Sequence, residues 1–263
     1  MATITQGNPL LSDARVAKVR GELTGTHSTM TVGGTITATL ALLVVFLAAG
    51  AVGWSAAYDA VTEVTNPVTG EITYQGSLPG WIFVAMLVGV GAGFATAFVP
   101  KIAMFTGFIY ALGYGAAIGA ISGFYEMQFD GIVGQAVLTT VGVFLAVLVA
   151  YATGIIKVTG KFVMTILLAM AGIFAMFLVG WIASIFGADI AFWNEPTPMG
   201  IGISIAIAIV AALSLAIDFA FIDRGTQEGL PKQMEWYGAF ALLSGLVWLY
   251  ITILRILALT RQS

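Results

Sequence analysis

Long apolar stretches dominate this sequence and decide the class of structure it can form. Seven stretches of 20 to 27 residues contain only two charged side chains, Asp218 and Arg255. Each is long enough for an α-helix, which rises 1.5 Å per residue, to cross about 30 Å of hydrocarbon. Strands of a membrane barrel would be shorter and would alternate polar with apolar residues, whereas 141–150 is apolar throughout. We therefore predict an all-α membrane protein, a seven-transmembrane-helix bundle, over 31–57, 80–99, 102–123, 131–154, 162–187, 199–222 and 236–258.

Composition excludes most soluble functions. Hydrophobic residues make up 59% of the 263 residues and charged residues only 9%, whereas a soluble domain has about a quarter charged residues. The lipid bilayer must therefore be the main solvent of the chain, and soluble enzymes and nucleic-acid-binding proteins are excluded. Because the chain has no cysteine, disulfides and thiolate metal sites are excluded as well.

The charged residues outside the apolar stretches predict the topology. A polar N-terminal arm, 1–30, precedes the transmembrane domain, 31–258, and a short tail, 259–263, follows it. The first apolar stretch is too long for the apolar core of a signal peptide, so we expect no cleavage. Lysine and arginine favour cytoplasmic loops, and those that precede the last stretch all lie in the arm or in the second, fourth and sixth loops: Arg15, Lys18, Arg20, Lys101, Lys157, Lys161, Arg224 and Lys232.

This distribution places the N-terminus in the cytoplasm and the odd-numbered loops outside. Seven full spans then place the C-terminus outside, whereas a re-entrant last segment would place both ends inside; the first alternative is favoured. In the first loop, Thr62–Tyr74 contains two short β-type runs around the sequence Asn-Pro-Val-Thr-Gly, which predicts a small outer hairpin.

Regularly spaced glycines predict close helix packing. Gly115, Gly119 and Gly123 follow one another at intervals of four residues, and Gly89 and Gly93 repeat the pattern in the second span. Residues at this spacing share one helix face, and a face without side chains allows another backbone to approach closely. We interpret these glycines as packing positions.

Side chains able to carry chemistry are scarce. We find no catalytic motif, no metal-ligand spacing and no cofactor-binding loop, so we expect neither an enzyme nor a bound cofactor. Asp218 is the only acidic residue inside an apolar stretch. Such residues usually face a partner or a water-filled cavity, and low dielectric disfavours the charged carboxylate, which makes Asp218 a candidate proton switch. The alternative is that Asp218, about one turn from the predicted helix end, reaches headgroup water. Candidate hydrogen-bond donors within the bundle are Tyr110, Tyr114 and Tyr151.

Several strings resemble the Bax inhibitor-1/YccA-like family, closest to its actinobacterial-type branch. They are Leu213–Asp223, Glu235-Trp236 and Trp248–Leu257, together with Gly119–Ser122 followed by Gly131–Leu138. The resemblance covers roughly 30–260 and includes the seven-span layout. It implies a polytopic protein of the bacterial inner membrane that is not an enzyme. Some members are described as pH-sensitive calcium leak channels governed by aspartates on the sixth and seventh helices, and others as modulators of a membrane-bound protease or of stress survival.

The resemblance carries over only in part. Asp218 matches the sixth-helix aspartate, but 236–263 contains no acidic residue, and Leu249–Thr252 stands where the seventh-helix partner belongs. A glutamate that relatives often carry in the third helix is replaced by Tyr114. A carboxylate pair that shares a proton needs two close acids, so the resemblance does not extend to such a pair in this sequence.

Two functions follow as hypotheses. In the first, the bundle is a weak cation leak, with Ca²⁺ as a permeant ion and Asp218 as a gate element; neutralising Asp218 would free it from hydrogen-bond partners and shift the packing of the last two helices. In the second, the protein does not conduct and instead modulates a membrane protease or the stress response through its helices and its N-terminal arm. A substrate-coupled transporter ranks last, because the sequence shows no inverted repeat.

Overall fold

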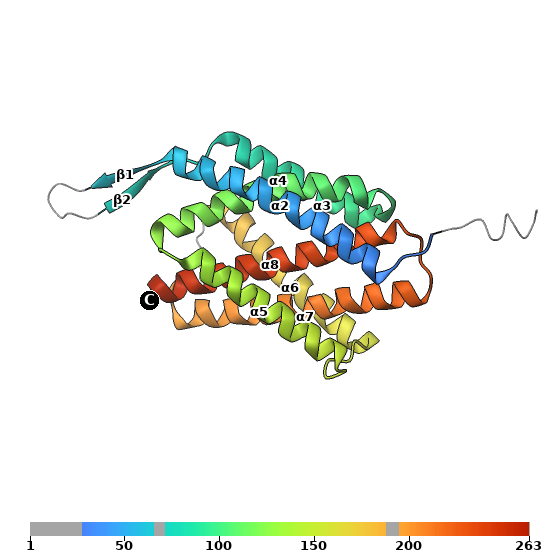
Figure 1. The fold of residues 1–263 in the computed structure, drawn as a ribbon. Helices are drawn as coiled ribbons and strands as arrows, with labels where there is room; N and C mark the ends of the chain where they lie inside the picture. Colours follow the sequence, from blue (N-terminus) through green and yellow to red (C-terminus); the bar gives the residue numbers. More distant parts are fainter. Residues whose placement is uncertain (1–27, 66–71, 188–194, 263) are drawn as a thin grey trace, which may run out of the picture.

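The computed structural model describes residues 28–65, 72–187 and 195–262, and this part of the chain confirms the predicted fold class. It contains seven helices that are long and apolar enough to cross a membrane, which lie side by side as a bundle (Figure 1). They are α2 (Val32–Ala60), α3 (Gly80–Phe98), α4 (Ala103–Gln128), α5 (Ile132–Ala152), α6 (Gly160–Ile185), α7 (Pro198–Gln227) and α8 (Met234–Gln262). A short 3-10 turn, η2 (Pro100–Ile102), joins α3 to α4.

Four helices extend past the C-terminal ends that the apolar stretches predicted. Helix α2 continues to Ala60, α4 to Gln128, α7 to Gln227 and α8 to Gln262. The predicted tail, 259–263, is thereby corrected, because 259–262 belongs to α8. Hydropathy drops where polar residues begin, but backbone hydrogen bonding continues through polar turns that can protrude from the hydrocarbon. Of the predicted N-terminal arm, residues 1–27 lie outside the described part of the chain.

Two small features distinguish the ends of the bundle. At one end, which we call the hairpin end, α2 leads into the antiparallel strands β1 (Val61–Thr65) and β2 (Ile72–Gly76), with Val61 opposite Gly76. This is the predicted hairpin, and it projects beyond the helices (Figure 1). At the opposite end, which we call the arm end, residues just before α2 pair with the α7–α8 loop. The Met30 N–H donates to the Leu230 carbonyl at 2.7 Å, and the Lys232 N–H donates to the Ser28 carbonyl at 3.0 Å.

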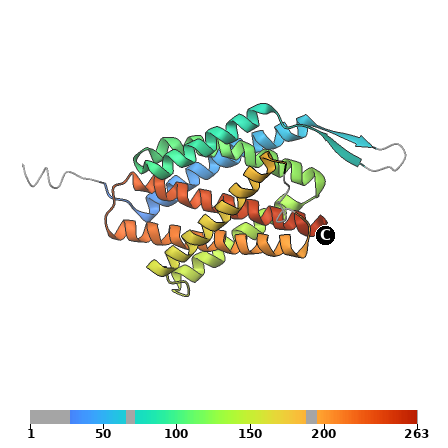
Figure 2. The same cartoon turned by 180° about the vertical axis from the view of Figure 1, so that it is seen from behind.

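Helix α8 is the centre of the bundle. It packs against α2, α4, α5 and α7, and Leu243, Leu249 and Leu254 are each 1% exposed. Helix α6 is its opposite: it packs on α7, and Ile166 is its one buried residue. Figure 2 shows α6 as the golden helix that runs obliquely across α7 and α8. One face of the molecule is therefore made by a helix with little support from the core.

The predicted glycine face lies where α2 and α4 pack together. A Cβ built on Gly115 would lie 2.6 Å from the Phe46 carbonyl oxygen, and one built on Gly119 would overlap the backbone of Gly50. At Gly123 the corresponding distance to the Trp54 oxygen is 3.4 Å. The absence of side chains at these positions thus lets two backbones meet directly.

The second glycine pair lies on α3 and faces α4. A Cβ on Gly89 would lie 2.6 Å from the Tyr114 backbone nitrogen, so the backbones of α3 and α4 are in contact at this position. Gly93 is less constrained, because its Cβ would lie 3.4 Å from Cδ2 of the Tyr110 ring. Helix α4 is therefore held between α2 and α3 on two glycine-lined faces, and its tyrosines occupy the space that remains.

Candidate functional site

Asp218 lies deeper in its helix than the sequence indicated. Helix α7 begins at a Thr197 cap, whose hydroxyl accepts the Gly200 N–H at 3.2 Å, and continues to Gln227. Asp218 therefore lies nine residues before the helix end, or about 13 Å along the axis. The predicted end at 222 had placed it only about one turn from the helix terminus.

The Asp218 carboxyl group faces α8 at Gly245. A Cβ built on Gly245 would lie 3.1 Å from Asp218 Oδ2 and 2.8 Å from Cδ2 of Leu215. Leu215 is fully buried, whereas Asp218 is half-buried. A glycine at this point of α8 thus leaves room for a leucine and a carboxyl group one turn apart on α7.

No described residue donates a hydrogen bond to the Asp218 carboxyl group. The neighbouring hydroxyls donate to backbone carbonyls of their own helices: Ser214 to the Ala211 carbonyl at 2.8 Å, and Ser244 to the Ala241 carbonyl at 2.9 Å. The expected hydrogen-bond partners are therefore not found in the described part of the chain. A carboxyl group in this position can take up or release a proton, and its charged form depends on water for solvation.

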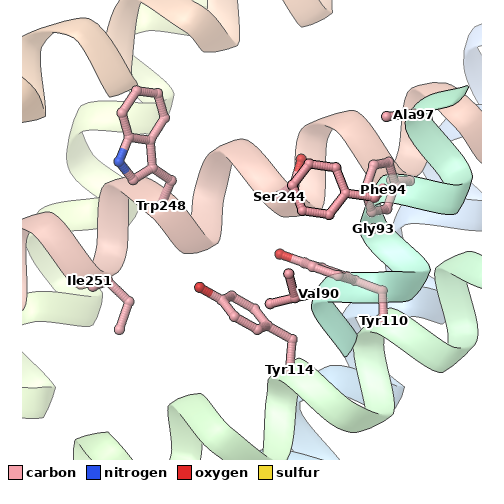
Figure 3. Close-up of a pocket in the computed structure, with 10 residues that line it drawn as sticks. Val90, Gly93, Phe94, Ala97, Tyr110, Tyr114, Ser244, Trp248 and Ile251 are labelled. Carbon is pink, nitrogen blue, oxygen red and sulfur yellow. The ribbon is translucent and has the colours of Figure 1, made fainter. Parts of the chain in front are cut away.

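Tyr110 and Tyr114 line a cavity on a neighbouring face of the same stretch of α8. The cavity has a volume of about 380 Å³ and lies between α3, α4 and α8. Figure 3 shows both phenol rings projecting from α4 into the space bordered by Ser244, Trp248 and Ile251. The rings stack at a centroid distance of 5.2 Å. Asp218 does not line this cavity, but its neighbour across the interface, Gly245, directly follows Ser244.

Tyr151 contacts a different acid, Asp223. Its hydroxyl donates to Asp223 Oδ2 at 3.4 Å, and Gln227 donates to Asp223 Oδ1 at 2.9 Å. These groups lie at the arm end, where Asp223 is exposed. Of the three tyrosines expected to donate hydrogen bonds within the bundle, Tyr110 and Tyr114 thus lie at the cavity and Tyr151 contacts Asp223.

Sequence reasoning missed the most buried acid in the described chain. Glu235 is 4% exposed, and its Oε1 accepts the Thr31 N–H at 3.0 Å and the Thr31 hydroxyl at 2.9 Å. The Thr31 hydroxyl in turn accepts the Gly34 N–H at 2.9 Å. Since a helix N-terminus carries partial positive charge, the carboxylate stabilises the start of α2. An acid directly before an apolar stretch was the only signal in the sequence.

A second contact that the sequence did not indicate lies towards the hairpin end. The Ser122 and Tyr250 hydroxyl oxygens are 2.7 Å apart, and Ser122 is buried. The Ser122 hydroxyl donates to the Ile118 carbonyl at 2.8 Å. A hydroxyl has one proton to donate, so Tyr250 is the donor between the two, and this bond joins α4 to α8.

The described residues offer little for a tightly bound metal. They contain no group of three or more His, Cys, Asp or Glu side chains arranged to hold an ion. Arg255, the other charged residue of the apolar stretches, lies with its guanidinium 6.0 Å from the centre of the Phe177 ring on α6, at the limit for a cation–π contact. The arrangement thus provides one protonatable carboxyl group in a helix interface and a small cavity beside it.

Comparison with known proteins adds one match. The family model described as Bax inhibitor 1 like matches residues 8–262, which is nearly the whole chain. No curated protein and no solved structure matches it.

Proposed function

The chain belongs to the Bax inhibitor 1-like family, and we propose that it is a weak, pH-sensitive cation leak whose protonation-linked element is Asp218. Ca²⁺ is the permeant ion of the proposal, and the membrane is the inner membrane of a bacterium. The chain catalyses no reaction in this proposal. Its seven membrane-spanning helices place it in contact with lipid.

The observation that carries the proposal is the position of Asp218 against Gly245. A charged carboxylate inside the membrane costs about 2.5–3.5 kcal/mol unless it is solvated or paired. Because no described residue donates a hydrogen bond to it, ionisation favours entry of water between α7 and α8. Protonation removes the charge and allows the two helices to close on the neutral group.

The same observation implies weak passage. Hard cations such as Ca²⁺ prefer six to eight oxygen ligands, and one carboxyl group cannot form such a cage. Tyr110 and Tyr114 line the adjoining cavity, and their hydroxyls are neutral oxygens. A permeating ion would thus be solvated mainly by the water that enters between α7 and α8 when Asp218 is ionised.

Flux into liposomes tests the proposal. The wild-type protein, Asp218→Asn and Asp223→Asn are reconstituted with a calcium indicator inside the vesicles, and influx is measured from pH 6 to pH 8. Raising the pH removes the proton from Asp218, so wild-type influx should rise with pH. Asp218→Asn should show pH-independent flux, while Asp223→Asn, changed at an exposed acid, should behave as the wild type. Equal pH dependence in the wild type and Asp218→Asn would refute the role of Asp218.

The orientation is part of the proposal and has its own test. We propose that the arm end faces the cytoplasm, because Lys101, Lys157, Lys161 and Lys232 lie in the loops and helix starts of that end. The chain has no cysteine, so single cysteines can be introduced at Lys161 and at Ser77, which lie at opposite ends. In intact cells a membrane-impermeant maleimide should label Ser77→Cys and leave Lys161→Cys unmodified. The reverse pattern would contradict the orientation.

One observation favours a second function, that of a non-conducting interaction protein. Helix α6 exposes large apolar side chains, including Leu168 at 61% and Phe174 at 62%, while Ile166 is its one buried residue. A helix of a partner such as a membrane protease could pack on this face. A photo-crosslinking residue at Phe174 should then capture a protein, whereas one at Val44 of α2, 66% exposed, should capture lipid. Lipid adducts at both positions would contradict this function.

A further inference from the structure

A groove runs along the bundle between α2 and α5, with α8 as its floor towards the hairpin end and mainly α7 as its floor towards the arm end. Both helices pack on α8, but they make at most marginal contact with each other in the described chain. Figure 1 shows α8 visible between them. We call this space the α2–α5 groove. It opens sideways, towards the surface that a membrane-spanning bundle presents to lipid.

Two cavities occupy the groove end to end. The cavity towards the arm end has a volume of about 780 Å³, and α5 contributes Phe144, Leu148 and Tyr151 to it. The cavity towards the hairpin end has a volume of about 520 Å³, and α5 contributes Val137 and Val141 among others. On the floor they meet at the adjacent residues Leu242 and Leu243 of α8. The two cavities therefore form successive parts of one groove.

The walls suit hydrocarbon chains. Residues at the rim are apolar and exposed: Ile36 at 54%, Leu47 at 60% and Val141 at 49%. Along α2 the lining extends from Val32 to Trp54, which is about 33 Å at 1.5 Å per residue and comparable to the hydrocarbon thickness of a bilayer. The Ser122 and Tyr250 hydroxyls are hydrogen-bonded to each other. The interior of the groove therefore presents few unpaired polar groups to an acyl chain.

Charge is concentrated at one end of the groove. Lys157, which follows α5, and Arg224, in the last turns of α7, both line the arm-end cavity. Both are exposed, and the Arg224 guanidinium gives one N–H to the Val158 carbonyl at 2.7 Å. A guanidinium has five N–H donors, so others remain for a ligand. These cations lie where the spans end, at the level of lipid headgroups.

We propose that the α2–α5 groove binds a glycerophospholipid, with its phosphate between Lys157 and Arg224 and its acyl chains along α2 and α5 towards Tyr250. Arginine and lysine are the usual partners of phosphate oxygens. The third charged group of the cavity, Asp223, is already engaged by Gln227 and Tyr151. The two cations and this one acid leave a single net positive charge, which balances the single negative charge of a phosphodiester. The lipid would complete the contact between two helices that do not pack on each other.

Native mass spectrometry of the delipidated full-length protein tests the proposal. Phosphatidylglycerol is titrated against diacylglycerol with the same chains, so that the two ligands differ only in the phosphate headgroup. The wild type should bind phosphatidylglycerol at least about tenfold more tightly, as expected for charge-assisted hydrogen bonds. Equal binding of the two ligands would overturn the phosphate site, and recovery of a bound protein in place of lipid would overturn the choice of occupant.

Matched variants separate the two parts of the site. Lys157→Glu and Arg224→Gln should each weaken phosphatidylglycerol binding, while Lys161→Glu, at an exposed lysine of the same end that lines neither cavity of the groove, should not. Val141→Trp should fill the groove and weaken both lipids, while Leu168→Trp on the exposed face of α6 should weaken neither. Thermal unfolding of each variant verifies that it is folded; Lys157→Glu removes no hydrogen bond of the described chain and so tests the site even if Arg224→Gln destabilises the fold. Loss of binding in the two control variants to the same extent would overturn the site.

Discussion

The carboxyl group of Asp218 occupies space that exists because residue 245 is a glycine. A Cβ at position 245 would lie 3.1 Å from Asp218 Oδ2, and it would also lie 2.8 Å from the buried Leu215 side chain. The lone acid of the apolar stretches and this glycine are thus complementary across the α7–α8 contact. Any side chain at position 245 must displace either the carboxyl group or the leucine.

Gly245→Ala should therefore lower stability and change the pH response together. Overpacking of a closely packed interface costs about 1–3 kcal/mol, which unfolding in detergent would measure. If the carboxyl group is the part displaced, the pH at half-maximal calcium flux should shift relative to the wild type. Gly202→Ala on the same helix as Asp218 is the control, because its Cβ meets nothing within 4 Å. A variant as stable as this control would show that the contact is not tight.

Gly119→Ala should be among the most destabilising single-methyl changes in the bundle. The added carbon would overlap the Gly50 backbone, and backbone cannot rotate away as a side-chain tip can. We expect a loss of at least about 3 kcal/mol. Gly142→Ala on α5, where the Cβ has no neighbour within 4 Å, should change stability by no more than about 1 kcal/mol. Equal stabilities of the two variants would contradict the close α2–α4 packing.

Removing the Glu235 carboxylate should loosen the start of α2. Glu235→Ala leaves the Thr31 N–H and hydroxyl without their acceptor, and a hydrogen bond to a charged group contributes about 1.5–3 kcal/mol. Thr31→Ala should cost about 1 kcal/mol or more through loss of the helix cap. The double variant should lose less than the sum of the two, because both changes remove the same contact. Strictly additive losses would show that the residues act independently.

Tyr250→Phe tests the bond between α4 and α8. The change removes one hydroxyl and leaves Ser122 its bond to the Ile118 carbonyl, so we expect a modest loss of about 0.5–1.5 kcal/mol. Tyr237→Phe is the matched control on α8, because the Tyr237 hydroxyl makes no hydrogen bond with the described residues, while its ring packs edge-on against Phe221 at 5.5 Å. A larger loss in Tyr237→Phe than in Tyr250→Phe would contradict the assignment.

Hydropathy and local spacing were enough to predict the bundle and the strand pair. Apolar length alone distinguishes a spanning helix from other elements, and the runs around Thr62–Tyr74 predicted β1 and β2. The same signal ended α7 at 222 because Asp223 and Arg224 are charged, although the helix continues to Gln227. Hydropathy reports where a helix leaves hydrocarbon, which is not where its hydrogen bonding ends.

Contacts between distant residues could not be predicted. Glu235 and Thr31 lie 204 residues apart, and no local pattern links an acid to the cap of another helix. Tyr151 was expected to donate a hydrogen bond within the bundle, but the sequence did not indicate its partner, which is Asp223. Such pairings depend on how helices rotate and slide against each other, which periodicity within one helix does not determine.

The Thr31–Glu235 contact bears on the order in which the bundle assembles. The first spanning helix leaves the ribosome early, but the carboxylate that completes its start belongs to the last one, 204 residues later. Until α8 has been inserted, α2 lacks both this acceptor and the central helix on which it packs. Helix α2 is thus synthesised before α8 but reaches its final place only after it, and a nascent protein truncated before residue 235 should hold α2 mainly through α4, with a smaller contact to α7.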